Sequence, residues 1–118
     1  MTSFNILKRE KDVRSIEAGQ AIFTEGQAGD VMYAVVEGEV NIVLNGQVLE
    51  TIGEGGIFGE LALLDERPRS ASAIANTNCK VAVIDLKQFS VLIQQPPYFA
   101  LDVMRVMAER LRRTSGSD

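Results

Sequence analysis

The sequence predicts a mainly β domain with flanking helices, a jelly-roll β-barrel followed by two C-terminal helices. Short runs of β-branched and aromatic residues, separated by glycines, occupy most of the chain from Ser15 onward. After Asp85 the apolar residues change to the three- and four-residue steps of a helix. The length of 118 residues allows one domain. We therefore expect a frayed or briefly helical lead-in over residues 1–14 and a single domain over residues 15–118.

The strand pattern is clearest in the middle of the chain. Val40, Ile42 and Leu44 alternate with other residues, which gives one apolar face, as in a strand that packs one side against a core. Asn45 and Gly46 follow, and both residue types tolerate the positive φ angles that a two-residue hairpin turn requires. The runs AIFTEG and VMYAVVEGEV before this hairpin, and VAVIDL after it, are further strand candidates.

Two helices are predicted at the C-terminal end, over residues 86–95 and 97–114. Asp85 suits the N-cap of the first helix, and the side chain of Gln88, three residues on, can reach back to it. Two consecutive prolines separate the helices, because proline suits the first turn of a helix and not its interior. The predicted buried faces consist of Phe89, Leu92 and Ile93 in the first helix and Ala100, Val103, Met104, Met107 and Leu111 in the second.

Composition excludes several classes of function. There is no histidine and Cys79 is the only cysteine, which excludes most transition-metal sites, Ser-His and Cys-His nucleophile pairs, and an intrachain disulfide. The net charge of −4 argues against a broad basic surface for nucleic acid or anionic lipid. No apolar run approaches the roughly 20 residues that span a bilayer, and the opening residues lack the apolar core of a secretory signal. We therefore expect a cytoplasmic domain that by itself binds neither nucleic acid nor membrane.

The stretch FGELALLDERPRSASA interrupts the strand pattern and carries the candidate binding residues. A good helix-forming run follows Gly59, so we expect unpaired backbone N–H groups from Gly59 to Ala62. Arg69 offers a planar fork of donors suited to two oxygens of one phosphate, and Ser70 adds a hydroxyl. Glu60 repels phosphate but can accept a hydrogen bond from a ribose hydroxyl. These residues indicate a nucleotide site, and the alternative reading of them is a solvated surface loop.

The same stretch resembles the phosphate-binding cassette of cyclic nucleotide-binding domains, written F-G-E-L/M-A-L, a variable loop and R-[ST/A]-A. This family includes bacterial catabolite activators, kinase regulatory subunits and cyclic-nucleotide-gated channels. Here the cassette reads FGELALLDERPRSA, and AGQAIFTEGQAGDVMYAVVEGEVNIV is similar to the opening strands of the family. The resemblance covers nearly all of Ile16 to Leu111. The spacing from Glu60 to Arg69 equals that of kinase regulatory subunits and is one residue shorter than in the bacterial activator.

The resemblance implies roles for the cassette residues. Arg69 is expected to hold the cyclic phosphate, Glu60 to accept the ribose 2′-hydroxyl, and Gly59 to permit the close turn. The groups expected to assist Arg69 are the Ser70 hydroxyl and the backbone N–H groups of Leu61, Ala62 and Ala71.

The resemblance also implies where the base lies. Leu49 and Ile52 align with apolar positions that wall the base pocket. Thr114 and Ser115 fall where the bacterial activator has the Thr-Ser pair that contacts adenine, and the alternative for these two residues is a polar tail after the helix. Ser70 is compatible with cAMP, since bacterial activators carry serine there, and a threonine at that position often favours guanine. The expected ligand is cAMP, with cGMP as the alternative.

For function, the resemblance implies a non-catalytic sensor that changes conformation when it binds a cyclic nucleotide and regulates a partner or effector. Family members act through an attached effector, and this sequence contains none, so the effector protein is unknown. We expect this chain to act as a stand-alone sensor that meets a partner, or as part of a larger protein. A metal-dependent enzyme on a jelly-roll scaffold is disfavoured because such sites usually need histidines. A protein-interaction domain without a ligand is the remaining alternative, although such a domain has no need of Glu60 and Arg69.

Overall fold

The computed structural model describes residues 12–64, 67–94 and 97–115. These residues form two four-stranded antiparallel sheets, with the strand orders β1-β8-β3-β6 and β2-β7-β4-β5. The elements are β1 (Val13–Ile16), β2 (Ala21–Phe23), β3 (Val31–Glu37), β4 (Val40–Leu44), β5 (Gln47–Ile52), β6 (Ile57–Phe58), α1 (Leu61–Leu64), β7 (Ser72–Ala75), β8 (Cys79–Asp85), α2 (Leu86–Leu92) and α3 (Pro97–Ser115).

The mainly β jelly-roll architecture with C-terminal helices is confirmed, although the two sheets are not closed into a barrel. Among the described strands no hydrogen-bonded ladder joins the edges of one sheet to those of the other, so the sheets remain open and face each other. The predicted lead-in over residues 1–14 lies mostly outside the described residues. Its last two members, Val13 and Arg14, already belong to β1.

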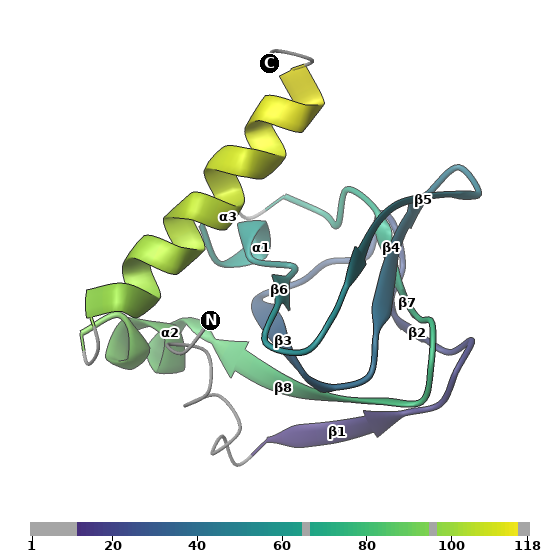
Figure 1. Cartoon of the computed structure of the whole chain (residues 1–118), viewed down its shortest axis with the longest axis horizontal. Helices are drawn as coiled ribbons and strands as arrows, with labels where there is room; N and C mark the ends of the chain where they lie inside the picture. The colour runs from purple at the N-terminus through teal and green to yellow at the C-terminus, as the bar shows by residue number, and fades with distance from the viewer. Residues whose placement is uncertain (1–11, 65–66, 95–96, 116–118) are drawn as a thin grey trace.

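The core follows from the two-residue period of β3, which lies between β8 and β6. Met32 and Ala34 on this strand belong to a cluster that includes helix residues Leu92 and Val103. The alternate β3 residues, Tyr33 and Val35, belong to a second cluster with residues of both sheets, including Val40, Phe58 and Ala73. The first sheet thus packs against the helices on one face and the second sheet on the other, and the helices gather on one side of the molecule (Figure 1).

Two local predictions are confirmed in detail. Asn45 and Gly46 join β4 to β5 with φ angles of 52° and 78°, the positive values that the hairpin turn requires. Asp85 caps α2, since its carboxylate accepts from the backbone N–H of Gln88 at 2.8 Å and the Gln88 side chain accepts from the Asp85 N–H at 3.0 Å. α2 ends at Leu92, earlier than predicted, and α3 extends one residue beyond the predicted end.

The predicted buried face of α3 is only partly correct. Val103 is buried and Met107 packs against the core. Met104 and Leu111 are 57% and 70% exposed, so their assignment to the core was wrong. Apolar side chains occupy a wider part of the α3 surface than the part that packs against the sheet. Only the side with Val103 and Met107 faces inward. The same side brings Arg110 to the sheets. No described helix is long and apolar enough to cross a membrane.

Candidate ligand-binding site

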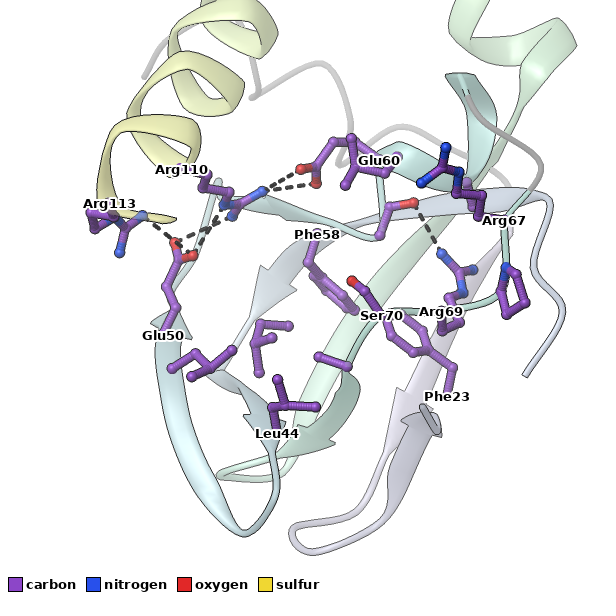
Figure 2. A pocket seen from close by; sticks show the side chains of 17 residues that line it. Phe23, Leu44, Glu50, Phe58, Glu60, Arg67, Arg69, Ser70, Arg110 and Arg113 are labelled. Carbon is purple, nitrogen blue, oxygen red and sulfur yellow. Dashed lines mark hydrogen bonds and ion pairs between the residues drawn. The ribbon is translucent and has the colours of Figure 1, made fainter. Parts of the chain in front are cut away.

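A cavity of about 780 Å³ opens between the β4–β5 hairpin, the segment from β6 to β7, and the C-terminal end of α3 (Figure 2). Eight of the eleven predicted site residues line it: Leu49, Gly59, Glu60, Leu61, Ala62, Arg69, Ser70 and Ala71. Ile52 does not line it, because this side chain is 4% exposed and points into the core between the sheets. Thr114 and Ser115 belong to the last turn of α3, and their side chains lie outside the described part of the structure.

Arg69 is held in place by contacts from three parts of the fold. Its Nη1 donates to the carbonyl of Gly59 at 3.0 Å and its Nη2 to the carbonyl of Val31 at 2.8 Å. The guanidinium carbon lies 4.1 Å from the centre of the Phe23 ring, within the range of a cation–π contact. The backbone N–H of Arg69 donates to the carbonyl of Gln27 at 2.9 Å, which fixes the segment after α1. The side chain is therefore preorganised at the wall of the cavity.

The charge of Arg69 is buried without a matching carboxylate. The residue is 7% exposed, and no ion pair joins it to an acid anywhere in the described chain. Two of the five guanidinium N–H donors serve the carbonyls, and the buried Nε has no hydrogen-bond partner among the described residues. Burial lowers the pKa of Arg69, and the opposing effects of Tyr33, Asp30 and Glu60 do not restore it. A buried cation with unused donors is suited to an anion.

Two glycines make room for this guanidinium. A Cβ at Gly29 would lie 2.5 Å from Cζ and 2.7 Å from Nη2 of Arg69. Gly59 has a φ of +72°, and a Cβ there would lie 2.8 Å from Nη1. The predicted role of Gly59 in a close turn thus has a structural basis. Gly29 was missed by the sequence analysis, which treated it only as a separator of strands.

Glu60 is also buried, at 6% exposure, and it is paired with an arginine that the sequence analysis did not single out. Nη1 of Arg110 lies 2.8 Å and 2.7 Å from the two Glu60 oxygens. Nε and Nη2 of Arg110 donate to Glu50 at 3.0 Å and 3.2 Å, and Nη2 also donates to the carbonyl of Ile57 at 2.8 Å. These contacts engage all five N–H donors of Arg110. Arg110 thus ties α3 to β5, β6 and the cassette.

The pKa shifts of the two arginines have opposite directions. Burial by itself lowers the pKa of Arg110, but the charge of Glu60 and the hydrogen bonds that Arg110 donates to Glu50 and Glu60 outweigh it and raise the pKa. Arg110 is therefore fully neutralised within the protein, whereas Arg69 is not. The repulsion between Glu60 and an incoming anion is reduced because Arg110 compensates the Glu60 charge.

The remaining cassette groups occupy the rim of the cavity. Ser70 is exposed and Ala71 is buried beside it, so the hydroxyl is accessible from the cavity. The N–H of Ala62 donates to the carbonyl of Gly59 at 3.3 Å, which means that this predicted amide donor already has a partner in the turn. Leu61 begins the short helix α1 and its side chain is 55% exposed.

The described residues contain no group of three or more histidine, cysteine or acidic side chains placed to hold a metal ion. The cavity combines an under-neutralised guanidinium, a neutralised carboxylate and an apolar wall that includes Ile42, Leu44 and Leu49. This combination is suited to a small anion that carries hydroxyl groups and a flat apolar ring.

Comparison with known proteins agrees with this assignment. The cAMP-dependent protein kinase regulatory subunit of Yarrowia lipolytica is 41% identical over 80 residues, which are 66% of this chain and 21% of that protein. The Cyclic AMP receptor protein of Thermus thermophilus is 36% identical over 99 residues, 80% of this chain and 46% of that protein. The chain therefore spans less than half the length of either relative.

The solved structure of the Thermus thermophilus Catabolite Activator Protein superposes with a TM-score of 0.79 at 31% identity, covering 97% of this chain and 56% of that one. The family described as cyclic nucleotide-binding domain matches residues 13–96, which include both sheets and the whole cassette. The chain belongs to the cyclic nucleotide-binding domain family.

Proposed function

We propose that this chain is a non-catalytic sensor module that binds a cyclic nucleotide, changes conformation on binding and regulates a partner or effector protein. The observation that carries this proposal is Arg69, a buried cation on the cavity wall that no described carboxylate neutralises. The ligand that we propose is cAMP, which the names of both curated relatives contain, with cGMP as the alternative.

The phosphate end of the ligand lies at Arg69 in this proposal. A cyclic phosphate is a monoanion, and the N–H donors of Arg69 that are not used by the two carbonyls can bind its oxygens. The Ser70 hydroxyl on the same rim supplies a neutral donor. Because the contacts to Gly59, Val31 and Phe23 already fix the guanidinium, little side-chain entropy is lost when the ligand arrives.

The ribose lies at Glu60. An ionised carboxylate offers about four acceptor directions, and Arg110 approaches the two Glu60 oxygens with a single nitrogen. Acceptor capacity therefore remains for the 2′-hydroxyl. The base then lies along the apolar wall formed by Ile42, Leu44 and Leu49.

The link between ligand and effector is Arg110 in this proposal. It is the residue through which α3 contacts Glu60, and a ligand hydroxyl on Glu60 changes the balance of forces on that contact. If the ligand binds one position of α3 more tightly than another, it shifts the population toward that position. The movement of α3 is then available to a partner protein.

Titration calorimetry of wild type and Arg69→Ala with cAMP and cGMP tests the proposal. We expect the substitution to weaken binding by on the order of ten- to a thousand-fold, since charge-assisted hydrogen bonds contribute about 1.5–3 kcal/mol each. The control is Arg14→Ala, which removes an arginine on β1 whose side chain is 58% exposed. Arg69→Lys keeps the positive charge but not the planar fork of donors. A variant that melts near the wild-type temperature and still binds weakly has lost binding and not folding.

Equal affinities of wild type and Arg69→Ala would show that Arg69 does not bind the phosphate. A wild-type protein that binds neither nucleotide would instead favour the alternative function, a protein-interaction domain of the same fold.

A further inference from the structure

The cavity lining includes an arginine of α3 at the end opposite Arg69. Arg113, in the last turn of α3, lines the cavity, and Figure 2 shows it across the pocket from Arg69 with apolar side chains between them. Its Nη2 lies 3.4 Å from Oε1 of Glu50, and its side chain is 51% exposed. Glu50 thus holds Arg113 near the β4–β5 wall through Nη2 alone, and the other N–H donors of Arg113 are not used in this contact.

Arg113 differs from its neighbour Arg110 in what it can offer a ligand. Arg110 uses all five N–H donors on Glu60, Glu50 and the Ile57 carbonyl, so it has none to give a base. Arg113 contacts Glu50 only through Nη2, at 3.4 Å, so most of its N–H donors remain available to a ligand. It is therefore the cation of α3 that can reach the part of a ligand farthest from the phosphate.

A guanidinium donates hydrogen bonds and accepts none, so it distinguishes the two purines. Guanine presents two neighbouring acceptors, O6 and N7, which an arginine fork matches, whereas adenine presents N7 beside an amino group that is itself a donor. With the phosphate at Arg69 and the ring against Leu44 and Leu49, Arg113 lies at the base end of the cavity.

Building on the proposed function, we propose that Arg113 is a base-reading residue and that it strengthens binding of cyclic nucleotides with a carbonyl at C6, cGMP above all. Glu50 acts as its positioning residue. The selectivity for the base thus comes in part from a charged side chain of α3, the same helix that Arg110 ties to Glu60.

The test is a calorimetric titration of wild type, Arg113→Met and Arg112→Met with cAMP, cGMP and cIMP. Inosine carries the C6 carbonyl without the 2-amino group, so cIMP isolates the contact to O6. We expect Arg113→Met to weaken cGMP and cIMP binding by roughly five- to tenfold, at the low end for an arginine–guanine pair because the side chain is half exposed. The affinity for cAMP should change by less than about threefold on the same grounds.

Arg112→Met is the matched control, because it removes the same charge from the same helical turn at a residue that does not line the cavity. It should leave the ratio of cGMP to cAMP affinity unchanged. If Arg113→Met weakens all three ligands by one factor, or none of them, the assignment is overturned although the proposed function stands. It is also overturned if wild type binds cAMP but neither cGMP nor cIMP. Wild type that binds no cyclic nucleotide refutes the proposed function, and this inference with it.

Discussion

Replacing Gly29 with alanine should remove tight ligand binding while the domain stays folded. The new Cβ would lie 2.5 Å from Cζ and 2.7 Å from Nη2 of Arg69, so the guanidinium must leave its position. It then loses its hydrogen bonds to the carbonyls of Gly59 and Val31 and its contact with the Phe23 ring. The displaced group is the end of a flexible side chain, so the backbone of the sheets need not move.

The magnitude follows from the contacts that are lost. Hydrogen bonds to charged groups contribute about 1.5–3 kcal/mol each, and a cation–π contact contributes about 0.5–2 kcal/mol. The displaced guanidinium regains water, so we expect the free energy of unfolding to fall by a net of about 1–3 kcal/mol. At about 4 °C per kcal/mol, the melting temperature should fall by roughly 4–12 °C. Affinity for cAMP should fall by on the order of ten- to a thousand-fold, as for Arg69→Ala.

The assay combines thermal unfolding with calorimetric titration of cAMP. Gly53→Ala is the matched control, since its Cβ would meet no atom within 4 Å and its φ is outside the left-handed region. That variant should bind as wild type does. A Gly29→Ala protein that binds cAMP within twofold of wild type would refute the idea that the observed position of Arg69 is the one that binds phosphate.

Three further predictions concern the carboxylate, the bridge to α3 and the buried thiol. Glu60→Gln should weaken cAMP binding about tenfold but leave binding of 2′-deoxy-cAMP nearly unchanged in competition titrations, and equal losses would contradict the ribose contact. Arg110→Met leaves the buried Glu60 without its arginine and removes the hydrogen bonds to Glu50, so it should lower the free energy of unfolding in urea by about 2–4 kcal/mol. Arg105→Met removes a 76% exposed side chain and should lower it by less than about 0.5 kcal/mol; similar losses for the two variants would count against the bridge. Burial raises the pKa of Cys79 above its ordinary value of 9.0, so the stabilisation from the protonated thiol is complete below that value and is lost as pH rises through the folded pKa. The difference in stability between wild type and Cys79→Ala should therefore shrink in urea unfolding above about pH 9, and a constant difference would contradict it.

Features set by neighbouring residues could be predicted from the sequence. The turn at Asn45 and Gly46 and the cap formed by Asp85 and Gln88 depend on residues within three positions of each other, and both were predicted correctly. The cassette was found for a similar reason, because its donors and acceptors lie within one short segment.

Features set by distant contacts could not be predicted in this way. Arg110 pairs with Glu60 and Glu50, which lie 50 and 60 residues away. Its spacing of seven residues from Val103 and three from Met107 showed only that it shares their side of α3. A two-residue period likewise shows which side of a strand is apolar and not which strand lies beside it. The openness of the sheets was missed for that reason.

The cavity wall shows the same distinction. Leu49 and Ile52 on β5 were both expected at the base pocket, but they lie on different sides of the strand, since they are three residues apart in a structure with a two-residue period. Leu49 lines the cavity and Ile52 fills the core. Only the pairing of β5 with β4 decides which of the two faces the ligand.

The most direct measurement is a calorimetric titration of the unmodified chain with cAMP, with 5′-AMP as the comparison ligand. The two share base and ribose but differ in the phosphate, which is a ring-closed monoanion only in cAMP. We expect saturable binding of one cAMP per chain and far weaker binding of 5′-AMP. Absence of cAMP binding, or equal affinity for both compounds, would contradict a site in which Arg69 and Glu60 hold a cyclic sugar phosphate.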